Sequence, residues 1–172
     1  MTLKILVISD THGYLSNARD VLNRIGKYMS GVIHLGDHSY DAEDLKTEYP
    51  DLPFYIVRGN NDFGSKAPNT ATLSFNGKKL VLTHGHLQQV YWNYDSLYYW
   101  AEEQGADAVL FGHTHHPVND NKGRILVFNP GSISMPRGVP QPTFGILEIA
   151  KNGMIYGSIM EYIDAQTFLR KA

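Results

Sequence analysis

The sequence contains no cysteine, no long apolar run and no large excess of charge of either sign. Without cysteine there can be neither disulfides nor thiolate metal ligands, so any metal ligand must come from histidine, carboxylate or amide side chains. No apolar run reaches the length of about 18 residues that a membrane-spanning helix needs. The net charge of −2 predicts neither extended nucleic-acid binding nor attraction to a membrane surface. The apolar start, which lacks a leader's cleavage site, favours a cytoplasmic protein.

Short β-rich apolar runs alternate with stretches of helical spacing, which indicates an α/β fold. With 172 residues, 42% of them hydrophobic, a single domain over residues 1–172 is expected. The expected strands are Ile5–Ile8, Val32–Leu35, Phe54–Val57, Leu80–Leu82, Ala108–Phe111 and Ile125–Phe128. The expected helices are Leu15–Met29, Ala42–Glu48 and Ser96–Gln104. Two later hairpins are expected to turn at Asn76-Gly77 and Asn152-Gly153.

Side chains able to bind metal follow five of these strands. They are Asp10, His12, Asp37, Asn60, His84, His113 and His115. Singly, the aspartates could be helix caps and the histidines ordinary core residues, but their repetition at strand ends beside glycines favours a shared site. In extended geometry, each Asp-x-His or His-x-His pair would point both side chains the same way. Such oxygen and nitrogen ligands suit Mn²⁺ foremost, with Ni²⁺, Fe²⁺ or Zn²⁺ as alternatives, and two such ions are typical of phosphoester hydrolysis.

The ordered motif blocks resemble those of the calcineurin-like metallophosphoesterase family. The blocks are Asp10-Thr11-His12, Gly36-Asp37, Gly59-Asn60-Asn61-Asp62, His84-Gly85-His86 and Gly112-His113-Thr114-His115. The small single-domain prokaryotic phosphodiesterases of this family are also similar at Asn129-Pro130-Gly131-Ser132 and at Ser134-Met135-Pro136-Arg137. The resemblance covers residues 3–149, almost the whole chain.

The resemblance implies a four-layer α/β/β/α sandwich, two packed mixed β-sheets flanked by helices, with a dinuclear metal site. The implied ligands are Asp10, His12 and His115 for one metal, Asn60, His84 and His113 for the other, and Asp37 for both. In the family a water that bridges the two metals is the nucleophile. Asp37 and Asn60 would thus take part in catalysis as ligands.

The sequence departs from many family members at Asn61, where they have a histidine that contacts substrate and protonates the leaving group. An amide cannot donate a proton in this way, and such a loss typically costs about 10²–10⁴-fold in rate. His86 or His38 could take over, although supporting the metal ligands is the role that such neighbouring residues more often have. Asn61 and Arg137 are candidate substrate contacts, Arg137 as a phosphate clamp or simply as a solvated rim residue.

The leading hypothesis is a metal-dependent phosphodiesterase acting on a small phosphodiester or nucleotide-type substrate. The alternatives are a phosphomonoesterase and a protein-binding scaffold like the retromer subunit that resembles this fold. Asp37 and Asn60 keep the family residues that the retromer subunit has altered, which favours the enzyme. Six aromatic residues between Tyr91 and Trp100 are expected mainly in the core, and a homo-oligomer is left open.

Overall fold

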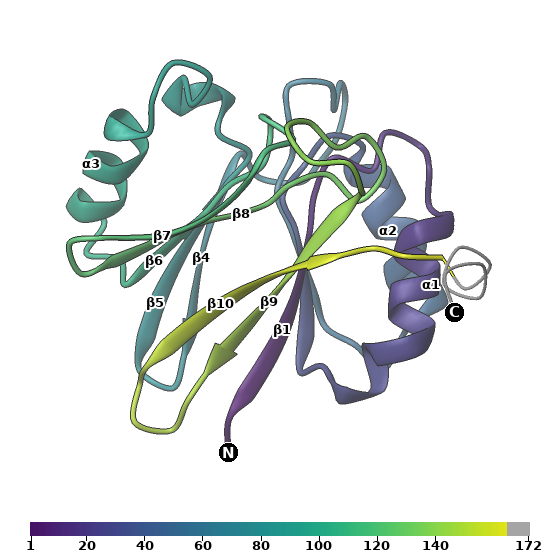
Figure 1. The fold of residues 1–172 in the computed structure, drawn as a ribbon, viewed down its shortest axis with the longest axis horizontal. Helices are drawn as coiled ribbons and strands as arrows, with labels where there is room; N and C mark the ends of the chain where they lie inside the picture. The colour runs from purple at the N-terminus through teal and green to yellow at the C-terminus, as the bar shows by residue number, and fades with distance from the viewer. Residues whose placement is uncertain (165–172) are drawn as a thin grey trace.

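The computed structural model describes residues 1–164, in which two five-stranded sheets pack face to face (Figure 1). Helices α1 (Ser16–Ile25) and α2 (Ser39–Glu48) cover the outer face of one sheet, and α3 (Asp95–Glu103) covers the outer face of the other. This arrangement confirms the predicted α/β class and its four layers. The single domain over residues 1–172 stays a prediction, and residues 165–172 lie outside the described part of the chain.

The first sheet has the order β10-β9-β1-β2-β3. Strand β1 (Leu3–Ile8) pairs in parallel with β2 (Gly31–His34), which pairs in parallel with β3 (Phe54–Ile56). On the other side of β1, β9 (Thr143–Ile149) and β10 (Ile155–Glu161) add antiparallel pairs. The parallel strands therefore deliver the loops that follow them to one edge of the sheet.

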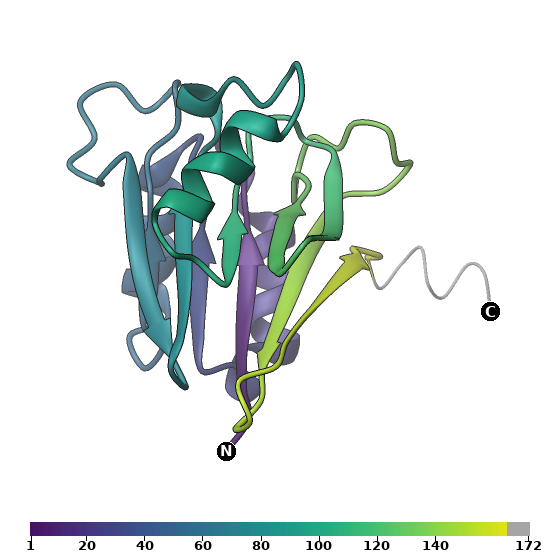
Figure 2. The same ribbon diagram turned by 90° about the vertical axis from the view of Figure 1, so that its left-hand side faces the viewer.

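The second sheet has the order β4-β5-β6-β8-β7. Strands β4 (Thr70–Phe75) and β5 (Lys78–Thr83) form the predicted hairpin, and β6 (Ala108–Leu110) lies parallel to β5. Strand β8 (Ile125–Pro130) pairs in parallel with β6 and antiparallel with β7 (Pro117–Lys122). Figure 2 shows this sheet behind α3.

The buried core lies in three layers, which β1 illustrates. Ile5 and Val7 face the space between the sheets, whereas Leu6 and Ile8 face α1 and α2. All four side chains are fully buried, and burying such a side chain stabilises the fold by about 1.5–3 kcal/mol. The strand is thereby fixed on both faces, which holds the loop after it in place.

Most element bounds differ from the sequence prediction by a few residues. The first helix ends at Ile25 and continues only as a 3₁₀ turn over Gly26–Tyr28, and a second 3₁₀ turn covers His86–Gln88. The sequence did not predict β7, because this edge strand is mostly exposed and polar. In the described part of the chain, no helix has both the length and the apolar character to cross a membrane.

Candidate metal centre

The predicted ligands gather at the edge where four parallel strands end. Asp10 follows β1 and Asp37 follows β2, and these strands are parallel neighbours in one sheet. His84 follows β5 and His113 follows β6, which are parallel neighbours in the other. Because the loops after parallel strands leave from the same edge of a sheet, the sheet pairing brings these side chains together.

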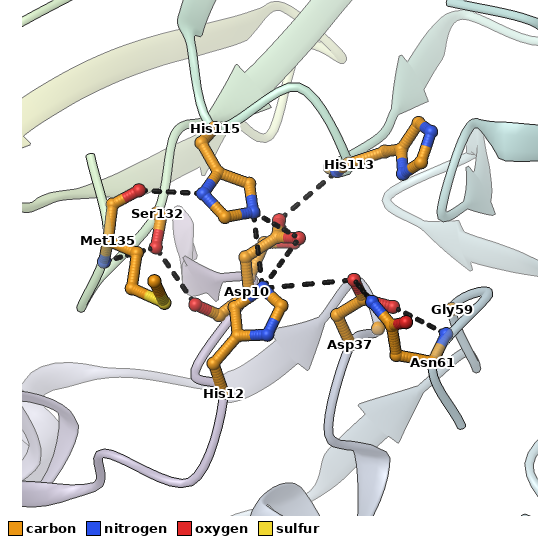
Figure 3. A network of polar contacts seen from close by, with 12 residues as sticks. Asp10, His12, Asp37, Gly59, Asn61, His113, His115, Ser132 and Met135 are labelled. Carbon is orange, nitrogen blue, oxygen red and sulfur yellow. Dashed lines mark hydrogen bonds and ion pairs between the residues drawn. The ribbon is translucent and has the colours of Figure 1, made fainter. Parts of the chain in front are cut away.

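Asp10, His12 and His115 form the first group, with ligand atoms all within 4.8 Å of one another (Figure 3). The Nε2 atoms of His12 and His115 face each other at 3.2 Å. Asp10 Oδ1 lies 3.3 Å from His115 Nε2 and 3.8 Å from His12 Nε2. Two imidazole nitrogens and a carboxylate oxygen that converge in this way are suited to a shared cation.

Asp37, His84 and His113 form the second group within the same distance limit. His84 Nε2 lies 3.3 Å from Asp37 Oδ1, and the rings of His84 and His113 are 4.9 Å apart. The other carboxylate oxygen, Asp37 Oδ2, lies 3.8 Å from His12 Nε2 in the first group. Asp37 thus faces both groups, one oxygen toward each.

Backbone carbonyls orient the buried imidazoles. Nδ1 of His84 lies 2.7 Å from the Leu35 carbonyl, and Nδ1 of His115 lies 2.6 Å from the Met135 carbonyl. A carbonyl only accepts hydrogen bonds, so each Nδ1 carries a proton and each Nε2 is the ring atom left to bind a cation. Burial alone would lower the pKa of both rings, but the contacts of His84 with Asp37 and of His115 with Asp10 raise it, so a bound cation would take the place of the Nε2 proton. This is the arrangement that metal-binding histidines commonly have.

The carboxylate of Asp10 is fixed through one oxygen and free at the other. Asp10 Oδ2 accepts hydrogen bonds from the Ser9 hydroxyl at 2.5 Å and from the His113 N–H at 3.1 Å. Asp10 Oδ1 and His84 Nε2 are buried and have no hydrogen-bond partner in the described part of the chain. Buried groups of this kind are costly unless something satisfies them, and a cation would satisfy both, so the residues present fit bound metal.

The charges in the site favour ionised carboxylates. Burial alone would raise the pKa of Asp10, but its contacts with His115 and His84 outweigh burial and hold that pKa below its ordinary value. The pKa of Asp37 is likewise lowered against burial by His84 and Asn61. Burial, followed by the charge of His84, lowers the pKa of His113 to about 4. That ring is therefore neutral near pH 7, as a metal ligand must be.

The backbone of the site loops is left-handed, which corrects the prediction of extended Asp-x-His and His-x-His pairs. Among residues 1–164, eight non-glycine residues have positive φ, and six of them lie in these loops. The six are Asp10, His12, Asp37, His38, His113 and His115, with φ between 49° and 72°. The prediction fails because both strands end before their motif pairs begin, and the chain turns sharply there. Such conformations cost about 1–3 kcal/mol each and cluster at functional sites.

The two amides of the third motif lie in different surroundings. Asn61 reaches Asp37 twice, with its N–H 3.1 Å from Oδ1 and its Nδ2 2.7 Å from Oδ2. Asn60 is exposed and lines an adjoining pocket together with His86. Six of the seven predicted ligands come together in the two groups of histidines and carboxylates. The roles of Asn60 and Asn61 stay predictions.

Two candidates for proton transfer lie beside the groups. The His38 ring is 5.4 Å from the His12 ring, and the His86 ring is 5.6 Å from the His84 ring. Burial, followed by the charge of His84, lowers the pKa of His86. Near pH 7 this ring is mainly neutral, which makes it a weak proton donor.

Arg137 reaches the site through a tyrosine that the sequence did not single out. Arg137 Nη1 donates a hydrogen bond to the Tyr91 hydroxyl at 3.0 Å, and that hydroxyl donates to the His113 carbonyl at 3.0 Å. The Tyr91 ring lies 4.5 Å from the His113 ring, and the Arg137 N–H donates to the His115 carbonyl at 3.1 Å. Tyr91 therefore links the Arg137 side chain to His113, and the Arg137 backbone itself contacts His115. The crowding of aromatic residues was its only sequence signal.

Comparisons with known proteins identify relatives of small size. Bacillus subtilis YsnB, a probable metallophosphoesterase, is 34% identical over 86% of this chain and 85% of its own. Escherichia coli phosphodiesterase YfcE is 29% identical over 85% of this chain and 88% of its own. A solved YfcE structure matches with a TM-score of 0.65 over 94% of this chain and 100% of that one.

A further structural neighbour is wild-type Vps29 from Entamoeba histolytica, solved in complex with zinc. It matches with a TM-score of 0.73 over 94% of this chain and 100% of that chain, at 22% sequence identity. At this identity the likeness shows the fold alone. The family model for the calcineurin-like phosphoesterase superfamily domain, however, matches residues 3–152. The chain that brings these histidines and aspartates to one sheet edge thus belongs to the calcineurin-like phosphoesterase superfamily.

Proposed function

We propose that this protein hydrolyses small phosphodiesters with the help of two divalent cations. The observation that carries the proposal is the position of Asp37, whose two oxygens face two adjacent groups of ligand atoms. Asp10, His12 and His115 would hold one cation, His84 and His113 the other, and Asp37 both. Asn60 is proposed for the second cation on the family resemblance alone, since its side chain is exposed.

The cations, when bound, supply positive charge for the phosphate oxygens and lower the pKa of a water molecule between them. The donors are imidazole nitrogens and carboxylate oxygens, so Mn²⁺ is the first candidate, with Ni²⁺, Fe²⁺ and Zn²⁺ as alternatives. The chain's own part is to hold the ligands through Leu35, Met135 and Ser9, and to offer Arg137 to the phosphate.

Preference for a diester rests on two arguments. The relative YfcE is itself named a phosphodiesterase. A diester also carries one fewer negative charge than a monoester dianion, so it needs less compensation from cationic side chains. Because His86 is a weak proton donor and Asn61 cannot donate to a leaving group, we expect esters with good leaving groups to react fastest. His86 is retained as the proposed contact of the leaving group.

The test is hydrolysis of bis(p-nitrophenyl) phosphate beside p-nitrophenyl phosphate, using chelator-stripped protein with and without added Mn²⁺. We expect activity only with metal, faster hydrolysis of the diester, and loss of both in His115→Ala. His116→Ala, an exposed neighbour, is the matched control and should keep full activity. A protein that binds two metals per chain and hydrolyses neither ester would instead favour the alternative function of a protein-binding scaffold.

The Tyr91 hydroxyl should matter for substrate binding. In Tyr91→Phe the ring contact with His113 is kept, but the hydrogen bond that orients Arg137 is lost. A hydrogen bond of this kind contributes about 1 kcal/mol, so KM for the diester should rise by about fivefold while kcat changes little. Steady-state kinetics with Tyr99→Phe, an exposed tyrosine on α3, provides the control. An unchanged KM would show that Arg137 does not contact the substrate through this arrangement.

A further inference from the structure

A second polar pocket adjoins the candidate metal centre. Its volume is about 390 Å³, and its lining includes Asn60 and His86, which come from two of the metal-motif blocks. The ring of His86 lies 6.1 Å from the ring of His113, so the pocket begins beside the second ligand group. A substrate whose phosphate sits at the ligand groups would extend a neighbouring part of itself into this pocket.

Arg58 supplies the positive charge of the pocket. This residue is half-buried at the end of β3, and it precedes the motif glycine Gly59. Its Nε donates to Asn69 Oδ1 at 2.7 Å, and its Nη1 donates to the Ser65 carbonyl at 3.4 Å. The backbone N–H of Arg58 also bonds the Pro68 carbonyl at 2.9 Å. The side chain is therefore held in place while most of its N–H groups remain available.

The guanidinium of Arg58 has no carboxylate partner within 4.0 Å among residues 1–164. Asp62 is the one carboxylate that lines the pocket, and it is 5% exposed. Both of its oxygens are occupied, by the Ser39 N–H at 2.7 Å and by the Gly59 N–H at 2.6 Å. An arginine that is positioned by neutral acceptors and has no carboxylate in direct contact can bind an anion through its remaining N–H groups.

We propose that the Arg58 pocket binds a second anionic group of the substrate, a phosphate, while the scissile phosphate lies at the ligand groups. The inference rests on the proposed phosphoesterase function, and it narrows the substrate to compounds with two phosphate groups close together. The guanidinium forms two parallel N–H···O bonds with a phosphate, which neutral lining residues cannot replace. Phe63, 86% exposed at the same pocket, offers a ring face to the rest of the substrate.

Calorimetric binding of adenosine phosphates to the Mn²⁺-loaded protein and to the chelator-stripped protein tests this proposal. The probes are adenosine 5′-monophosphate, adenosine 5′-diphosphate and adenosine 3′,5′-bisphosphate, which offer a second phosphate at two distances. We expect at least one bisphosphorylated probe to bind about tenfold more tightly than the monophosphate, as a charge-assisted contact would give. In Arg58→Gln this advantage should fall below about twofold, and Arg58→Lys should retain part of it.

Phe63→Ala is the matched control, because it alters the same pocket without changing its charge. It should weaken all three probes together and leave the advantage of the second phosphate intact. Equal affinities in the wild type, or an advantage that survives Arg58→Gln, would overturn the proposal. Hydrolysis of the nitrophenyl diester is measured separately. A protein that hydrolyses the diester but binds all three probes equally tightly would refute only the proposed anion binding by Arg58. An inactive protein that shows the advantage refutes only the phosphodiesterase function.

Discussion

Replacing Asp37 with asparagine is expected to lower kcat/KM for the diester by about 10³-fold and to reduce the bound metal below two ions per chain. The two oxygens of this carboxylate face different ligand groups, Oδ1 at 3.3 Å from His84 Nε2 and Oδ2 at 3.8 Å from His12 Nε2. An amide keeps the size of the side chain but removes its negative charge and one of its two acceptors. The loss of several kcal/mol of metal-dependent stabilisation of the transition state corresponds to about that factor in rate.

The matched control is Asp44→Asn, which makes the same change at an exposed position on α2. Metal content by elemental analysis, diester kinetics and thermal unfolding are measured on the wild type and both variants. Asp37→Asn should lose metal and activity, whereas Asp44→Asn should keep both. If Asp37→Asn retains two metals and at least a tenth of the wild-type kcat/KM, Asp37 does not bridge them.

Local patterns predicted the α/β class and the neighbourhood of the site, and the family resemblance added the four layers. Buried strands such as β1 carry apolar residues on both faces, and this signal does not require knowledge of distant parts of the chain. Asp10 and Asp37 lie just past strand ends, and parallel pairing then places them side by side. Once the strands were assigned, the convergence of six predicted ligands followed from topology.

The finer arrangement could not be predicted in this way, because it depends on backbone angles and on contacts across the chain. Asn60 and Asn61 are chemically identical neighbours, and only the turn of their loop decides which one reaches Asp37. The left-handed φ of His113 and His115 could not be predicted, because histidine adopts this region more often than most residues but still uncommonly. The contact between Tyr91 and Arg137 joins residues 46 positions apart, and no sequence spacing indicates it.

His34 is a buried polar residue to which the sequence assigned no chemistry, yet it joins two of the site loops. Its Nδ1 accepts a hydrogen bond from the Gly36 N–H at 3.2 Å, so the ring proton must be on Nε2. Nε2 lies 3.2 Å from the Thr11 hydroxyl, which in turn donates to the Asp37 carbonyl at 3.4 Å. The loops after β1 and β2 are thus connected through a neutral imidazole. A second ring proton would oppose the Gly36 N–H.

The free energy of unfolding of the chelator-stripped protein is therefore expected to decrease as the pH falls, because of His34. Burial lowers the pKa of His34 from 6.5 to about 4. Between these two pKa values, His34 binds a proton in the unfolded chain but not in the folded chain. The folded state therefore keeps its full stability above the pKa of the unfolded chain, and it loses stability as the pH falls toward the pKa of the folded chain. Between pH 7.5 and pH 5 this residue should account for about 2 kcal/mol of the loss in the free energy of unfolding.

Urea unfolding at the two pH values, on chelator-stripped wild type and His34→Asn, measures this contribution. Asparagine can still accept the Gly36 N–H but cannot take up a proton, so the variant should be less stable at pH 7.5 and should lose about 2 kcal/mol less than the wild type on acidification. His116→Asn removes an exposed histidine instead and should keep the wild-type dependence. Identical losses in wild type and His34→Asn would mean that folding does not lower the pKa of His34, and that the Gly36 N–H does not hold Nδ1 unprotonated.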